Sequence, residues 1–267
     1  MSHEGAGIGE LRAFAVEVIR EAGREAMAFY GKGRRDQKFD EDLVTEAELH
    51  LIGFFHERLR RHFPEHEVFG DAPPRKDYVH GHKGYLWVYD ALDGVANFQA
   101  GIPLWGTSLA LFENFWPVLG LFLMPVTGDL FYAEPDGGAF LNDVPIGISY
   151  SGEINNESLL FTYSRMHDHF RSNFPGKIRN LGCTAAHISY VAMGRAEGAL
   201  MRSVSYQDLA AAQIILQASG GSIRFLDGKP FHLNEYFEAR RVEGTLLAAP
   251  DGAHETIQGY VREVGQP

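Results

Sequence analysis

Residues 85–141 contain a series of short apolar segments separated by turn-forming residues. Glycine, proline, asparagine and aspartate favour turns, and they cluster at 128–129, 135–137 and 142–143. The apolar segments have the length of single strands and lie at 85–89, 107–112, 118–123, 130–133 and 138–141. We therefore expect a meander of neighbouring antiparallel strands over this region.

Two amphipathic helices are predicted ahead of the meander. Apolar residues recur at helical spacing over residues 8–29, and Gly31 follows the end of this pattern. The second helix is expected to start near Thr45, which forms a capping-box spacing with Glu48, and to stop at Pro64.

The pattern changes beyond Gly147. Expected strands and helices now alternate, near 158–162, 185–193, 198–201, 206–218 and 245–249, which is typical of an α/β arrangement. A chain of 267 residues corresponds to one or two domains. We expect an N-terminal α+β part at 1–148 and a C-terminal α/β part at 149–267, with no flexible linker between them.

The composition limits the possible partners and compartment. A net charge of −11 provides no basic surplus to neutralise phosphates, which disfavours nucleic acid as a partner. A small phosphorylated substrate is still compatible, because a bound divalent cation reverses the local sign of charge. Cys183 is the single cysteine, so no intrachain disulfide is possible, as in a reducing compartment. We find no signal-peptide pattern and no stretch of 18 apolar residues, and we expect a cytoplasmic protein without a membrane partner.

A buried-strand pattern at 85–89 ends directly in Asp90, and Asp93 follows three residues later. Carboxylates at this spacing can share one hard cation and reach a second, as Mg²⁺ sites require. Gly94 permits an unusual backbone, and a short helix after it would present free N–H groups to an anion. The spacing alone fits equally well a tight turn at Asp93 and a helix cap at Asp90.

A third acid, Asp208, lies at the start of the apolar segment 206–218, which Gly220 and Gly221 follow. Aspartate at a helix N-terminus is usually a cap, and on its own this interpretation is favoured. Asp71 follows Gly70 in what is commonly a turn.

These segments, taken in order, resemble the inositol monophosphatase family, the Mg²⁺-dependent, lithium-sensitive phosphomonoesterases. The resemblance covers nearly the whole chain and is carried by Asp42-Leu-Val-Thr45, Asp90-x-Leu-Asp93-Gly with Asn97-Phe98, Gly137-Gly138-Ala139, Gly182 followed by Ala185, Gly194-Arg-x-x-Gly198, and Asp208 with Gly220-Gly221. On this resemblance a metal role for Asp90, Asp93 and Asp208 is favoured over a purely structural one.

The resemblance implies an α/β fold, a layered αβαβα sandwich of the sugar and inositol phosphatase type. It implies that Asp90 bridges two Mg²⁺ ions and that Asp93 and Asp208 complete one of their sites. Asp71 and the backbone carbonyl of Leu92 would serve the other, with about two or three cations in all.

The resemblance also implies the substrate side of the site and a homodimer. The expected catalytic residues are Glu48, Asp71, Asp90 and Asp93. The expected substrate-binding residues are Gly94, Val95, Ser164, Gly182, Cys183 and Met201. The substrate would be a small phosphorylated polyol, sugar or nucleotide.

The sequence departs from the family pattern at several of these positions. Val95 replaces a threonine or serine that helps orient the attacking water, and losing such a group can cost roughly 2–4 kcal/mol in a transition state. Glu48 is one methylene longer than the usual aspartate, and Asp71 is one shorter than the usual glutamate. Gln207 replaces a tryptophan, and Met201 replaces a glutamate of the inositol-specific members.

Two hypotheses follow from these departures. In the first, Glu48 takes over the orientation of water, Asp71 binds metal, and the protein is a working phosphatase. In the second, the site is catalytically attenuated, and the protein binds a metal or phosphate ligand in a regulatory role.

Overall fold

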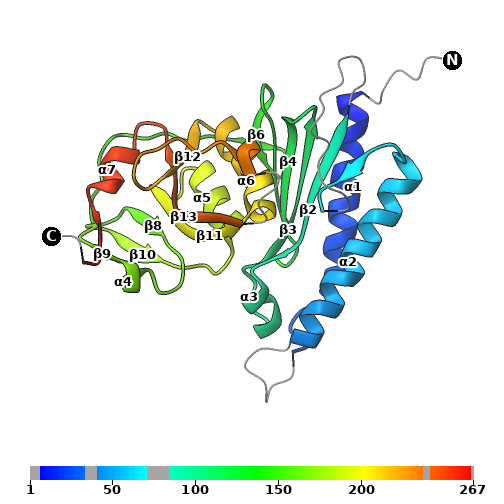
Figure 1. The fold of residues 1–267 in the computed structure, drawn as a ribbon, viewed down its shortest axis with the longest axis horizontal. Coiled ribbons are helices and arrows are strands. Elements are labelled where there is room, and N and C mark those ends of the chain that lie inside the picture. The colour runs from blue at the N-terminus through cyan, green and yellow to red at the C-terminus, as the bar shows by residue number, and fades with distance from the viewer. Residues whose placement is uncertain (1–6, 34–40, 71–83, 237–240, 266–267) are drawn as a thin grey trace.

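The computed structural model describes residues 7–33, 41–70, 84–236 and 241–265, which form alternating layers of helices and sheets (Figure 1). The first layer consists of α1 (Ile8–Met27) and α2 (Glu41–His62). α1 packs on β3 and β4 of the adjacent sheet, and α2 packs on β2. No helix within the described ranges is both long and apolar enough to cross a membrane.

The first sheet has seven strands in the order β1-β2-β3-β4-β5-β6-β7. Its strands are β1 (Glu67–Val68), β2 (Tyr85–Asp93), β3 (Gly106–Glu113), β4 (Trp116–Met124), β5 (Asp129–Glu134), β6 (Gly138–Leu141) and β7 (Val144–Ile146). From β2 to β7 every pairing is antiparallel, which confirms the predicted meander. The parallel pairing of β1 with β2 was not predicted.

The second sheet has five strands in the order β10-β8-β11-β13-β12. Its strands are β8 (Leu159–Phe161), β10 (Lys177–Arg179), β11 (Gly198–Ser205), β12 (Gly221–Phe225) and β13 (Arg241–Pro250). Between the two sheets lie α5 (Thr184–Ala192) and α6 (Tyr206–Ala218) (Figure 1). α6 packs on β3, β4 and β5, and α5 packs on β11 and β13.

Short elements complete the fold. On the far side of the second sheet lie α4 (Met166–His169), α7 (His254–Gln258) and the ribbon of β9 (Phe170–Ser172) and β14 (Val261–Glu263) (Figure 1). α3 (Val95–Ala100) follows β2 directly, and a 3₁₀ turn spans Leu233–Tyr236. The order helix, sheet, helix, sheet, helix is the expected αβαβα sandwich.

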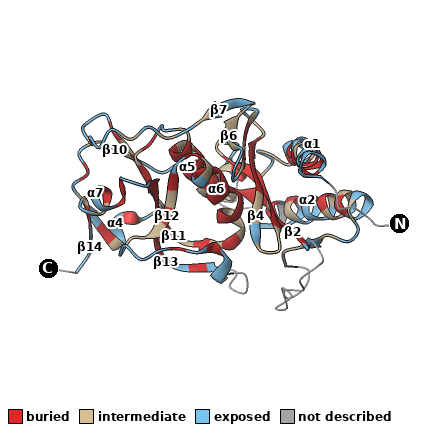
Figure 2. Ribbon diagram, turned by 90° about the horizontal axis from the view of Figure 1, so that it is seen from above, coloured by how far each residue is buried: buried red, intermediate tan, exposed pale blue. Residues whose placement is uncertain are grey.

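Three apolar cores hold the layers together, and buried residues concentrate there (Figure 2). One lies under α1 and α2, one joins both sheets to α5 and α6, and one lies on the far side of the second sheet. Trp87, Phe98 and Trp105 belong to the core under α1 and α2, and their side chains are completely buried. Burying an aromatic side chain of this kind stabilises a fold by about 1.5–3 kcal/mol. The layers are therefore held mainly by apolar packing.

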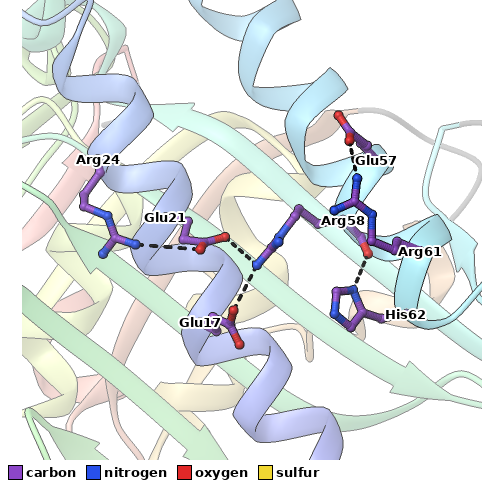
Figure 3. A network of polar contacts seen from close by, with 7 residues as sticks. All are labelled: Glu17, Glu21, Arg24, Glu57, Arg58, Arg61 and His62. Atoms are coloured by element: carbon purple, nitrogen blue, oxygen red, sulfur yellow. Dashed lines mark hydrogen bonds and ion pairs between the residues drawn. The ribbon is translucent and has the colours of Figure 1, made fainter.

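Ion pairs add a connection between α1 and α2 (Figure 3). Arg58 Nη2 of α2 lies 2.9 Å from Glu17 Oε1 and 2.7 Å from Glu21 Oε2, both on α1. Within α1, Arg24 Nη2 lies 3.9 Å from Glu21 Oε1. Such partly exposed pairs are worth about 0.2–1 kcal/mol each, so they contribute less to stability than the core beneath them.

The predicted start of the second helix is wrong, and β2 extends to Asp93, past the predicted end of this strand at residue 89. α2 begins at Glu41, so Thr45 and Glu48 lie inside the helix and do not cap its start. Residues spaced by three are also neighbours on a helix surface, so a capping-box spacing occurs within helices as well. The segment 206–218 is helical at the predicted bounds, and α2 stops before Pro64 as expected.

Candidate active site and metal centre

β2 positions Asp90, Leu92 and Asp93 at its end, where the pairing with β3 shifts register between the two aspartates. Residues between Asp90 and Asp93 therefore do not pair regularly with β3, and local hydrogen bonds fix their positions. Thr107 Oγ1 donates to Asp90 O at 3.0 Å, and Leu92 N donates to Asp90 Oδ1 at 3.2 Å. Asp90 Oδ2 is buried and has no hydrogen-bond partner among the described residues.

Gly94 makes the turn from β2 into α3. Its φ is 88°, in the left-handed region that glycine adopts without strain. A Cβ here would lie 3.0 Å from Leu104 O and 3.1 Å from Trp105 Cα. A short helix does follow Gly94, and it starts at Val95. The first N–H groups of a helix lack intrahelical partners, and here they follow directly on the aspartates.

Asp93 joins the first sheet to the start of α5. Its carboxylate accepts hydrogen bonds from Cys183 Sγ at 3.2 Å, Thr184 N at 3.1 Å and Ala185 N at 2.6 Å. A carboxylate at a helix N-terminus satisfies free N–H groups and is favoured by the helix dipole. The spacing alone also fitted a simple turn at Asp93. In the structure its carboxylate also caps the start of α5.

Asp208 is fixed at the start of α6 by a capping box. Ser205 Oγ accepts from Asp208 N at 3.1 Å, and the Asp208 carboxylate accepts from Ser205 Oγ at 2.5 Å and from Ser205 N at 3.2 Å. The capping interpretation is thus correct for Asp208. Capping does not exclude metal binding, because each carboxylate oxygen can accept more than one contact.

Gln207 connects α6 to β2. Its Nε2 donates a hydrogen bond to Tyr89 O at 3.2 Å, next to Asp90. Phe69, at the end of β1, stacks on Tyr206 with 4.7 Å between the ring centroids. These two contacts hold the start of α6 against the edge of the first sheet that carries the aspartates.

The carboxylates from α2, β2 and α6 lie close enough to influence one another electrostatically. Burial raises the pKa of Asp90 well above its usual range, and the charges of Asp208, Asp93 and Glu48 raise it further. Burial and the charge of Asp208 raise the pKa of Asp93 to about 7, against the lowering effect of its hydrogen bonds from α5. Burial also raises the pKa of Glu48 and of Asp208. Four acidic side chains are therefore gathered at one place, where burial and their mutual repulsion oppose their ionisation.

This donor set fits a hard divalent cation. Carboxylate oxygens and a backbone carbonyl are the ligands that Mg²⁺ prefers, and a cation would relieve the mutual repulsion of the acids. The buried, unpartnered Asp90 Oδ2 points to the same need. No three histidine, cysteine or acidic side chains of the described ranges form a closed metal cluster by themselves. Asp71 lies outside the described residues.

The predicted substrate residues are divided between two places. A cavity of about 230 Å³ brings together Ser164, Gly182, Cys183, Met201 and Asp208. Gly94 and Val95 lie beside the aspartates of β2, and the Asp93–Cys183 hydrogen bond joins this place to the cavity. Sequence reasoning missed Arg202 and Arg241, which also line the cavity. No local motif marks them, because β11 and β13 bring them together only by pairing.

Comparison with known proteins identifies the class to which the chain belongs, the metal-dependent phosphomonoesterases. The sequence pattern described as "Inositol monophosphatase family" matches residues 8–266. The chain belongs to the inositol monophosphatase family.

Two curated relatives illustrate the range of this family. The chain is 30% identical to a histidinol-phosphatase of Chlorobaculum parvum, over 78% of this chain and 82% of the relative. It is 27% identical to a fructose-1,6-bisphosphatase/inositol-1-monophosphatase of Thermotoga maritima, over 94% and 95%.

A solved structure confirms the fold. The inositol monophosphatase of Zymomonas mobilis superposes with a TM-score of 0.76 at 21% identity, covering 96% of this chain and 98% of that one.

Proposed function

We propose that this chain is a Mg²⁺-dependent phosphatase that hydrolyses a small phosphorylated polyol, sugar or nucleotide with water as the nucleophile. The observation that carries the proposal is the buried group of carboxylates around Asp90, whose Oδ2 has no partner among the described residues. Family membership supports the reaction class.

In this proposal the acids of both parts of the chain, 1–148 and 149–267, hold the cations. Asp90, Asp93 and Asp208 would hold Mg²⁺, together with Asp71 and the Leu92 carbonyl. A bound cation would polarise the phosphoryl group and lower the pKa of a water molecule. The hydrogen bonds of Asp93 to α5 and of Asp208 to Ser205 keep these carboxylates oriented.

The remaining residues bind and orient the substrate. The N–H groups of Gly94 and Val95 would hold phosphate oxygens, and Ser164, Gly182, Cys183 and Met201 would line the space for the leaving alcohol. Glu48 would orient the attacking water and accept its proton, because Val95 has no hydroxyl. Burial raises the pKa of Glu48, and a raised carboxylate pKa favours proton transfer near neutral pH.

The decisive experiment measures phosphate release from inositol, sugar and nucleotide phosphates, with Mg²⁺ and with EDTA. We expect Mg²⁺-dependent release that falls by about 10² or more in Asp90→Asn. Asp136→Asn, in an exposed turn, is the matched control and keeps full activity. Mg²⁺ binding without release from any substrate would instead support an attenuated, regulatory binding protein.

We further propose, by family analogy, that the protein is a homodimer in the cytoplasm. The single cysteine is compatible with a reducing compartment. Light scattering coupled to size-exclusion chromatography gives the oligomeric state, and a monomeric mass would contradict the homodimer.

A further inference from the structure

Two adjoining cavities lie next to the second sheet, and Asp208 lines the first of them. The first, of about 230 Å³, contains Met201, Arg202 and Arg241 in its wall. The second, of about 440 Å³, shares Tyr163, Ser164 and Asn180 with it. Small-molecule sites usually occupy roughly 300–1,000 Å³, so the pair offers the space of a leaving group with several carbon atoms.

Strand pairing brings the two arginines to one cavity. β11 and β13 are antiparallel, with Arg202 opposite Thr245 and Ser205 opposite Arg241. The register shifts between Arg202 and Val204, and Ser203 between them has a φ of 51°. A serine in this region is strained, and such strain concentrates at functional sites.

Hydrogen bonds hold both guanidinium groups in place. Arg202 Nη1 donates to Thr245 Oγ1 at 2.9 Å. Arg241 Nε and Nη2 both donate to Ser203 O, at 3.1 and 2.6 Å. Neither arginine forms an ion pair with a carboxylate in the described part of the chain. Arginines oriented in this way can bind an anion without first losing a salt bridge.

Among the residues that line the first cavity, two are arginines and one is acidic. Met201 is almost completely buried and brings no acid to the wall. Asp208 is the carboxylate among the lining residues, and the proposed function assigns it to a cation. Burial raises the pKa of Asp208, and the charge of Arg241 opposes this shift, so the two groups interact. The second cavity adds Arg165 and Arg171 to its lining.

We propose that the substrate's leaving alcohol carries a second anionic group, a phosphate or carboxylate, which Arg202 and Arg241 bind. This inference rests on the proposed phosphatase function and narrows its substrate class. Water breaks the P–O bond of the first phosphate, its oxygen passes to inorganic phosphate, and the alcohol takes a proton. The second anionic group leaves unchanged. A leaving group with a cationic amine is disfavoured by repulsion from the same arginines.

The test uses substrates that differ only in the second phosphate. The first pair is fructose 1,6-bisphosphate and fructose 1-phosphate, and the second is adenosine 3′,5′-bisphosphate and adenosine 3′-phosphate. We expect kcat/KM to be about tenfold higher for the bisphosphate in at least one pair. Arg202→Gln and Arg241→Gln should lower this ratio towards one, mainly through KM, and Arg202→Lys should lower it less. Arg20→Gln, at an exposed position of α1, should leave the ratio unchanged.

A binding measurement separates this inference from the proposed function. In EDTA, calorimetry should show fructose 1,6-bisphosphate binding about fivefold or more weakly to Arg202→Gln and Arg241→Gln than to the wild type. Circular dichroism establishes that the variants are folded. The inference would be overturned if kcat/KM for the bisphosphate were no higher than for the monophosphate in both pairs. It would also be overturned if neither arginine variant weakened bisphosphate binding. Neither result would contradict the proposed phosphatase activity. Failure to hydrolyse any phosphate would overturn the proposed function, with the binding result still deciding the arginine site.

Discussion

The Cys183 thiol donates a hydrogen bond to Asp93 Oδ2 at 3.2 Å, across the contact between the first sheet and α5. Thr184 N and Ala185 N donate to the same carboxylate. Asp93 is thus a metal-ligand candidate and also the acceptor that satisfies the start of α5. The proposed site depends on this contact, because it brings the cavity beside Asp208 next to the end of β2.

We predict that the Cys183 thiol is unreactive in the native protein. Its side chain is 2% exposed, and burial together with the neighbouring Asp93 charge raises the pKa of the thiol well above its usual range. Because the thiolate is the nucleophile, labelling by a disulfide reagent near pH 8 should be about 10² slower than in urea. Rapid labelling of the folded protein would show that the contact with Asp93 opens readily.

Neutralising Asp90 should stabilise the metal-free protein and remove its response to metal. Asp90→Asn retains the acceptor for Leu92 N and removes one of several mutually repelling carboxylates. In EDTA at neutral pH we expect a melting temperature a few degrees above that of the wild type, since about 1 kcal/mol corresponds to a few degrees in a chain of this size. Added Mg²⁺ should raise the melting temperature of the wild type but not of Asp90→Asn. An equal Mg²⁺ response in both proteins would remove Asp90 from the metal site.

The sequence predicts those parts of the fold that carry a local signal. The helix at 206–218 combines a continuous apolar run, an aspartate at its start and a glycine pair after its end, and all three lie close together in the sequence. β9 and β14 are three-residue strands whose stability comes from pairing with each other over a long separation, so neither has a local pattern.

The same distinction applies to the candidate site. Asp90, Asp93 and Gly94 adjoin in one string, which made them recognisable, and the structure brings Asp208 and Glu48 within electrostatic reach of Asp90. Arg202 and Arg241 belong to different strands, and a bulge at Ser203 together with sheet pairing brings them to one cavity. Neither the bulge nor the strand pairing produces a recognisable local sequence pattern. Asp71 stays a prediction, because it lies outside the described residues.

Replacing Gly94 should damage both stability and activity. Alanine there would be strained at a φ of 88°, and its Cβ would crowd Leu104 O and Trp105. The matched control is Gly138→Ala, where φ is 84° but no atom lies within 4 Å of the added Cβ. Backbone strain alone costs about 1–2 kcal/mol, and we expect Gly94→Ala to lose about 1 kcal/mol more than Gly138→Ala in urea unfolding. Phosphatase activity should fall only in Gly94→Ala, and equal effects of the two variants would show that the crowding is relieved elsewhere.

His187 should make the protein less stable in acid. Its side chain is 4% exposed, burial lowers its pKa to about 4, and its Nε2 accepts a hydrogen bond from Leu181 N at 2.8 Å. Between about pH 6.5 and 4 the unfolded chain binds a proton that the folded chain does not, so stability falls as the pH falls through this window, by up to about 3 kcal/mol. Urea unfolding near pH 7 and pH 4.5 measures the difference. His187→Gln keeps an acceptor and should reduce this loss, whereas His232→Gln, at an exposed position, should reproduce the wild type.

Restoring a hydroxyl beside Gly94 should raise turnover. Val95 is the first residue of α3 and is partly buried, and threonine has nearly the same shape, so Val95→Thr should fold like the wild type. One additional group that orients the attacking water can lower the barrier by up to roughly 2–4 kcal/mol. Because Glu48 would already supply part of this orientation, we expect kcat to rise by about tenfold, with little change in KM.

Val144→Thr, at an exposed position of β7, is the matched control, and steady-state phosphate release with saturating Mg²⁺ is the measurement. If Val95→Thr leaves kcat unchanged and Glu48→Gln abolishes activity, Glu48 alone orients the water. If the wild type is only weakly active, and neither Val95→Thr nor Glu48→Gln changes its kcat, the cause of the weak activity lies elsewhere in the metal centre.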